Sequence, residues 1–139
     1  MTDHHGLLQP VPYETVRGVE IGHMDDRGII RNIIEGPMEH LAFITSKAGS
    51  YRAGHYHKVG WQWCFVVSGK VRCFSRKADP FRDSEVRIQI ARPYDLIITP
   101  PGVAHRHEYL EDTGFVAIYD VPRLHLEEKD TFPSPDDWK

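Results

Sequence analysis

The sequence predicts a single all-β domain, in which short strands form a sandwich or barrel. Short apolar segments bounded by Gly, Pro, Asp or Ser recur at intervals of ~8–12 residues. Val86, Ile88 and Ile90 alternate with polar neighbours, as expected for a strand with one buried face. No long stretch has the period of an amphipathic helix. At 139 residues, the chain can bury one core without disulfides.

The expected strands follow one another along the whole chain. They are Ile29–Glu35, His40–Ser46, Gly54–His57, Gln62–Ser68, Lys70–Arg76, Val86–Arg92, Leu96–Thr99 and Phe115–Asp120, with a further strand that opens on His105. Ser68-Gly69 is typical of a two-residue hairpin turn, which would place Cys64 opposite Cys73. Residues 1–15 are expected to form an extended N-terminal arm, residues 16–121 the barrel and residues 122–139 a C-terminal surface tail, because proline and polar residues prevail at both ends.

Charge and composition narrow the classes of partner. The net charge of -3 gives no reason to expect nucleic acid, and no apolar run approaches the ~20 residues of a membrane helix. We find no secretory signal and expect a cytoplasmic protein whose two cysteines stay reduced. Residues 47–106 hold 11 Lys/Arg against 4 Asp/Glu. This basic central segment favours a small anionic ligand.

Three histidines and a glutamine form the main candidate site. The pattern reads Gly49-x5-His55-x-His57-x4-Gln62-x6-Gly69, followed by Pro100-x-Gly102-x2-His105. Imidazoles one residue apart on a strand point to the same face, so the fold could bring these donors to one point. His107 shares the parity of His105 and would also face inward, either beside a metal ligand or as a core histidine bonded to a carbonyl.

Two chemistries fit this set of donors. Imidazole and an amide oxygen can hold a divalent metal ion, with His55, His57, Gln62 and His105 as ligands. Neutral imidazoles can also act as general bases near neutral pH. One nitrogen cannot do both, because a metal-bound nitrogen has no lone pair left to accept a proton. We therefore expect either no required cofactor or one divalent metal ion: Zn, Fe, Ni or Mn.

The two motifs resemble the double signature of the cupin superfamily, which implies a double-stranded β-helix, or jelly-roll barrel. Gln62 stands where the usual glutamate would be, and Tyr94 and Tyr109 stand for the usual Gly and Asn. The segment around Arg52-x-x-His55-x-His57-x4-Gln62 is similar to the 3,4-ketoisomerases of dTDP-linked keto-deoxysugars. The 3,5-epimerase of the rhamnose pathway is a related small cupin. The resemblance also implies a homodimer, which the open edges of such sheets favour.

On this interpretation, the protein is an isomerase or epimerase that removes a proton next to the carbonyl of a nucleotide-linked keto-deoxysugar. His55 and His57 are the candidate base and proton shuttle, and Arg52 would bind a diphosphate or the enolate. We expect Gln62, Trp63 and Tyr119 to contact the substrate, although Trp63 and Tyr119 also suit plain core packing. The alternative is a mononuclear metal cupin that acts as a dioxygenase or binds a small molecule.

Overall fold

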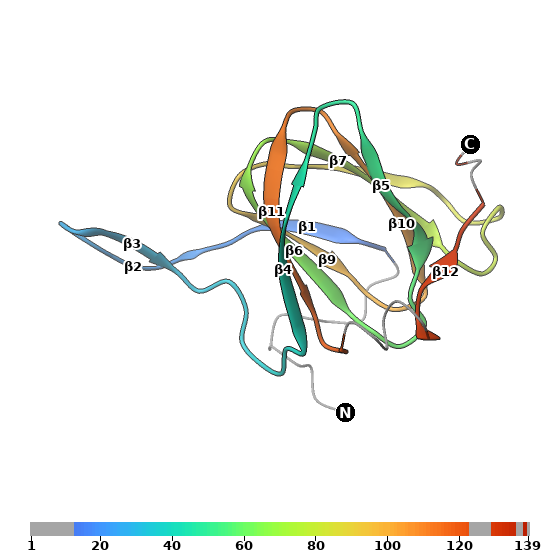
Figure 1. Ribbon diagram of the computed structural model, residues 1–139, viewed down its shortest axis with the longest axis horizontal. Helices are drawn as coiled ribbons and strands as arrows, with labels where there is room; N and C mark the ends of the chain where they lie inside the picture. The colour runs from blue at the N-terminus through green and yellow to red at the C-terminus, as the bar shows by residue number, and fades with distance from the viewer. Residues whose placement is uncertain (1–12, 123–128, 136–137, 139) are drawn as a thin grey trace.

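The computed structural model describes residues 13–122, 129–135 and 138, and shows a jelly-roll barrel of two facing five-stranded sheets (Figure 1). The first sheet contains, in spatial order, β1 (Thr15–Gly18), β9 (Asp95–Thr99), β6 (Gln62–Ser68), β11 (Thr113–Tyr119) and β4 (His40–Ser46). The second contains β12 (Phe132–Pro133), β5 (Tyr51–Tyr56), β10 (Val103–Tyr109), β7 (Val71–Lys77) and β8 (Arg87–Ala91). A separate hairpin consists of β2 (Ile21–Asp25) and β3 (Gly28–Arg31). The expected all-β jelly roll is confirmed.

The core has two layers because the first sheet is covered on both faces. Residues from both sheets fill the barrel interior, among them Cys64, Val66, Cys73, Ile97, Tyr109 and Phe115. On the opposite face of the first sheet, Trp63 and Phe65 pack with Leu96, Ile98 and Ile118 beneath Val19, Ile33 and Ile34. Consecutive residues of β6 therefore enter different layers, as the two-residue period of a strand requires. This explains why Gln62–Val66 is buried throughout.

Local sequence pattern predicted most strands within one or two residues, and β4 and β6 agree at both ends. The expected strand Ile29–Glu35 is too long, since β3 ends at Arg31. Strand β5 begins at Tyr51, three residues before the expected Gly54. Strands β1, β2 and β12 were not predicted from the sequence. Each of these is five residues or shorter, and at that length a strand depends on its partner more than on its own propensity.

The predicted hairpin Gln62–Arg76 is wrong. Strand β6 pairs with β9 and β11, whereas β7 pairs with β8 and β10 in the other sheet. The turn at Ser68-Gly69 therefore crosses between sheets, and Cys64 does not face Cys73 across paired strands. Gly69 has a φ of 92°, and a Cβ there would collide with Asp112 and Thr113. Glycine is thus required by the crossing rather than by a hairpin. Both cysteines are buried and reduced, as expected.

The barrel includes residues expected outside it. Thr15 begins β1, and Glu14 is buried with 2% exposure. At the other end, Asp130 is buried and β12 pairs with β5. The remainder of the predicted arm, residues 1–12, and residues 123–128 of the predicted tail lie outside the described residues. Within the described ranges, nothing helical has the length and apolar character needed to cross a bilayer.

Candidate active site

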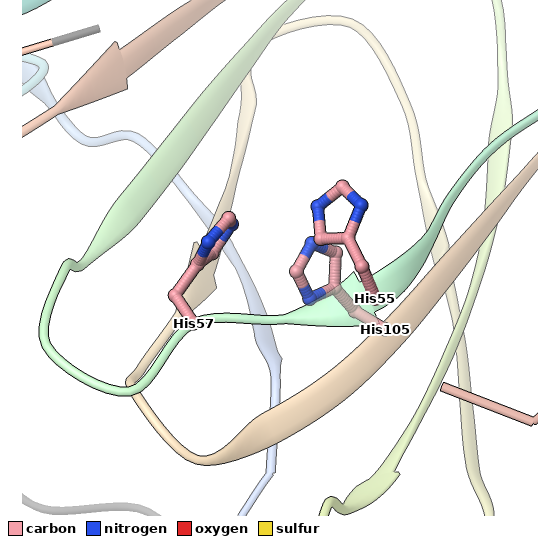
Figure 2. Close-up of side chains that lie close together, drawn as sticks. All are labelled: His55, His57 and His105. Atoms are coloured by element: carbon pink, nitrogen blue, oxygen red, sulfur yellow. The ribbon is translucent and has the colours of Figure 1, made fainter. Parts of the chain in front are cut away.

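Three histidine side chains converge inside the barrel, as the spacing predicted. His55 lies on β5, His57 directly follows that strand, and His105 on β10 is the register partner of His55. Figure 2 shows the three rings gathered in one space. Their potential ligand nitrogens lie within 4.8 Å of one another. The ring centroid of His55 is 4.7 Å from that of His105 and 4.9 Å from that of His57.

The turn after β5 is held by a carboxylate that the sequence analysis did not identify as functional. Asp130 accepts hydrogen bonds from the backbone N–H groups of Lys58, Val59 and Gly60, at distances from 2.7 to 3.1 Å. Its backbone oxygen lies 2.6 Å from Nδ1 of His57. A carbonyl oxygen can only accept, so Nδ1 of His57 carries the proton and Nε2 is directed to the site. The backbone carbonyl of Asp130 thereby fixes the tautomer of His57.

Gln62 is positioned beside the histidines by β6. Its Oε1 lies 3.3 Å from Nε2 of His57, and its Nε2 donates to the sulfur of Cys64 at 3.3 Å. When Nδ1 of His57 carries the only ring proton, the lone pair on its Nε2 faces the lone pairs on Oε1 of Gln62, and the two acceptors repel each other. A proton or a metal ion between these two atoms would remove the repulsion. Rotation of the Gln62 amide by half a turn would remove it as well.

Burial keeps two of the imidazoles neutral. Desolvation, followed by the effect of nearby His57 and His107, lowers the pKa of His55 to about 4. Desolvation and the neighbouring histidines also hold the pKa of His105 well below its usual value. His105 is completely buried, and its Nε2 has no hydrogen-bond partner among the described residues. Both rings therefore offer lone pairs near neutral pH, for a proton or for a metal ion.

The residues present fit a single divalent cation. Three imidazoles make a competent site for zinc, and the Gln62 oxygen is an uncharged fourth donor. The unpartnered Nε2 of His105 is the orphaned buried atom that a cation would satisfy. Among the residues that the structure describes, no carboxylate belongs to this cluster, so an ion held by these side chains alone would keep its full charge.

A cavity of about 220 Å³ opens beside the histidines and brings together most of the expected substrate residues. It is lined by Arg52, His55, Gln62, His107, Tyr109 and Tyr119, together with apolar side chains. Arg52 donates from Nε to Ser46 Oγ at 2.6 Å and from Nη2 to the Thr45 carbonyl at 2.9 Å. These bonds tie β5 to the facing edge strand β4. A guanidinium has five N–H donors, so others remain for a ligand.

Trp63 does not line this cavity, so the structure gives its predicted contact with substrate no support. The side chain is completely buried in the layer outside the first sheet, where it stacks on Trp61 with ring centroids 6.2 Å apart. It points opposite to Gln62 because adjacent strand residues face opposite ways. Tyr119, by contrast, lies at the cavity and stacks on His40 at 5.5 Å.

His107 has a buried acidic partner that the sequence could not reveal. Its Nε2 lies 3.0 Å from Oε2 of Glu14, and the Thr99 hydroxyl donates to the same oxygen at 2.5 Å. All three side chains are nearly inaccessible to solvent. Glu14 is 93 residues away from His107 in the chain, and no local pattern marks it. A carboxylate therefore takes the place of the carbonyl that one of the two predictions for His107 expected.

Comparison with solved structures agrees with the geometry: the chain has the cupin jelly-roll fold. The sugar 3,4-ketoisomerase QdtA from Thermoanaerobacterium thermosaccharolyticum, solved with TDP, superimposes with a TM-score of 0.70 and 17% identity, covering 88% of this chain and 89% of that one. RmlC from Streptococcus suis, in complex with dTDP-D-xylose, gives 0.63 and 19%, with 89% and 74% covered. The dTDP-4-dehydrorhamnose 3,5-epimerase from Sulfolobus tokodaii gives 0.61 and 16%, with 81% and 77% covered.

Sequence comparison adds no closer relative. No protein-family model matches the chain, and no curated protein matches it significantly. The structural neighbours are thus cupin-type sugar-nucleotide enzymes, and at these identities the likeness concerns the fold. The activity has to be argued from the site.

Proposed function

We propose that this protein is an isomerase or epimerase of a nucleotide-linked keto-deoxysugar in polysaccharide or glycoside biosynthesis. One observation carries the proposal: the neutral imidazole of His55 and the guanidinium of Arg52 line the same cavity. Moving a proton next to a carbonyl needs a base and a positive group near the oxygen that becomes charged. The similar fold of enzymes solved with TDP and dTDP-sugars supports this substrate class.

The proposed reaction is a proton transfer within the cavity. The neutral imidazole of His55, which lines the cavity, accepts the proton from the carbon next to the ketone, and the C–H electron pair forms the enolate. His57, whose ring lies beside that of His55, is the proposed proton shuttle. Donors of Arg52 stabilise the enolate oxygen or the substrate phosphates. For an epimerisation, a proton is then returned to the same carbon from its opposite face. For a ketoisomerisation, the proton of the neighbouring hydroxyl passes to the enolate oxygen and the imidazolium protonates the former carbonyl carbon. In both cases no net proton or electron is consumed. An anionic substrate close by would raise the lowered pKa of His55 toward the range of an effective base.

A divalent ion would be held by His55, His57, Gln62 and His105. Such an ion would supply Lewis-acid stabilisation of a negatively charged oxygen. Any imidazole nitrogen bound to it is lost as a base, so the metal content decides whether His55 and His57 can move a proton. Tyr119 remains at the cavity as a hydroxyl that could contact the sugar.

The second candidate is a mononuclear metal cupin that acts as a dioxygenase or binds a small molecule. The unpartnered Nε2 of His105 and the grouping of three imidazoles within 4.8 Å favour it. Elemental analysis of protein purified without nickel, combined with oxygen consumption, separates it from the isomerase. Stoichiometric iron with oxygen uptake, and no binding of dTDP or UDP, would refute the isomerase proposal and support the metal cupin.

The decisive experiment measures exchange of the α-proton of a dTDP-linked 4-keto-6-deoxysugar in deuterated solvent by NMR. The wild-type protein should catalyse exchange, and His55→Ala should abolish it. His23→Ala is a control for the loss of an imidazole, because His23 is exposed on the β2–β3 hairpin and does not line the cavity. Wild-type exchange no faster than buffer, with dTDP binding intact, would leave a binding protein and refute the enzymatic role.

A further inference from the structure

A second group of donor side chains lies beside the histidine cluster, and the proposed reaction does not use it. The carboxylate of Glu14, the thiol of Cys73 and the imidazole of His107 each offer one potential ligand atom, and these atoms lie within 4.8 Å of one another. All three residues are buried, with exposures of 2–3%. Carboxylate, thiolate and imidazole are the three side-chain groups that bind zinc in proteins.

Strands of both sheets bring this group together. Cys73 on β7 and His107 on β10 are register partners in the second sheet. Glu14 directly precedes β1 in the first sheet, where it lies beside Thr99 of β9. The Thr99 hydroxyl donates to Oε2 of Glu14 at 2.5 Å, and Oε1 of Glu14 lies 3.1 Å from Nε2 of His107. The donors are therefore fixed by strand pairing and by an outer hydrogen bond, as metal ligands usually are.

The spacing of the donors suits a small cation. In a tetrahedral zinc site, neighbouring donor atoms lie about 3.3–3.6 Å apart. The oxygens of Glu14 are 3.0 and 3.1 Å from Nε2 of His107, and the sulfur of Cys73 lies within 4.8 Å of the other donors. Side-chain shifts of roughly an ångström would bring all three to bonding distance. His107 also lines the cavity, which gives an ion a route to the group.

The charge of the group favours a divalent ion. Burial, followed by the nearby Glu14 carboxylate, raises the pKa of Cys73 well above its usual value, so the free thiol keeps its proton. A bound ion displaces this proton to solvent as the metal–sulfur bond forms. Thiolate and carboxylate together then neutralise the two positive charges of the ion. A buried site without net charge avoids most of the cost of desolvation, which the histidine cluster cannot do with neutral donors.

We propose that Glu14, Cys73 and His107 bind one zinc ion at a site separate from the histidine cluster. The ligand atoms are a carboxylate oxygen, Sγ and Nε2, with the imidazole proton on Nδ1, and water takes the fourth position. Thiolate and imidazole favour zinc over magnesium or calcium. The ion joins the segment before β1 to strands β7 and β10, and so links the first sheet to the second. This inference does not rest on the isomerase activity.

Cobalt(II) is the probe, because it replaces zinc and its bond to a thiolate gives a charge-transfer band in the near ultraviolet. The metal-free full-length protein should develop this band when it is titrated with cobalt chloride, and excess zinc should remove it. Cobalt bound by His55, His57 and His105 adds no such band, because that cluster contains no thiol.

Single substitutions assign the ligands. Cys73→Ala should abolish the band. Cys64→Ala is the matched control and should retain it, because Cys64 is equally buried but accepts a hydrogen bond from Gln62. His55→Ala, which removes an imidazole of the other cluster, should also retain it. Glu14→Gln should weaken cobalt binding, followed by this band, at least about tenfold, because an amide oxygen brings no negative charge.

Three results would overturn the proposal. The first is a wild-type protein that develops no near-ultraviolet band with cobalt, and this result does not depend on any variant folding. The second is a band that survives Cys73→Ala, which would assign the thiolate to the other cysteine. The third is an affinity that Glu14→Gln leaves unchanged, which would remove the carboxylate from the ligands.

Discussion

Substitution of Glu14 tests whether its buried contacts stabilise the barrel. Glu14→Ala would leave the Thr99 hydroxyl and Nε2 of His107 without their acceptor, in a region where all three side chains are 1–3% exposed. Each of these two buried groups left unsatisfied costs about 1–3 kcal/mol, so we expect a loss of roughly 2–6 kcal/mol in the free energy of unfolding. For a domain of this size, that corresponds to a fall in Tm of roughly 8–22 °C.

The assay is urea unfolding followed by tryptophan fluorescence, with Glu111→Ala as the matched control. Glu111 is more than half exposed and lies 3.5 Å from Lys70, so its removal should change the unfolding free energy by less than about 0.5 kcal/mol. Glu14→Gln keeps the shape and one acceptor, and should fall between the two. If Glu14→Ala is as stable as Glu111→Ala, the Glu14 contacts do not stabilise the fold and the reasoning fails.

Three further outcomes follow from the site. The pKa of His55 is lowered to about 4 and that of His105 is also lowered in the folded protein. As the pH falls, the unfolded chain therefore takes up protons on these histidines before the folded protein does. Stability is thus retained above about pH 6.5 and falls as the pH drops toward 4, which thermal unfolding in buffers without metal would show. Arg52→Ala should weaken dTDP binding by about 1.5–3 kcal/mol, and Arg52→Lys should restore only part of this in calorimetry. Desolvation raises the pKa of Cys64 to about 12 and that of Cys73 well above its usual value. Iodoacetamide at pH 8 should therefore label neither thiol until the protein is unfolded, and rapid labelling of the native protein would contradict their burial.

The strands and the histidine cluster illustrate what local pattern can predict. The expected bounds of His40–Ser46 agree with the structure, although the apolar residues 41–44 do not alternate with polar ones as the burial of the strand does. His55 and His57 share a face because they are two residues apart, and the Pro-Gly turn before β10 brings His105 alongside. These inferences use only geometry that repeats over a few residues.

Trp63 and the turn at Ser68-Gly69 are two features that local sequence pattern does not predict. Parity placed Trp63 opposite to Gln62, but it did not say that Val19, Ile33 and Ile34 would bury that face. A Ser-Gly pair suits a hairpin, yet here it crosses between sheets because β6 already has a partner on each side. Which strands pair depends on every other strand, and that information is not local.

The sequence by itself determined the fold class, the reduced buried cysteines and the face on which the imidazoles lie, because side-chain periodicity and turn chemistry act over a few residues. Only the tertiary structure decided that Glu14 would bond to His107, that Asp130 would fix His57, and that Arg52 would share a cavity with His55. The first two contacts join residues 93 and 73 positions apart. Such contacts form only when the whole barrel closes, since burial and desolvation, rather than local propensity, select them.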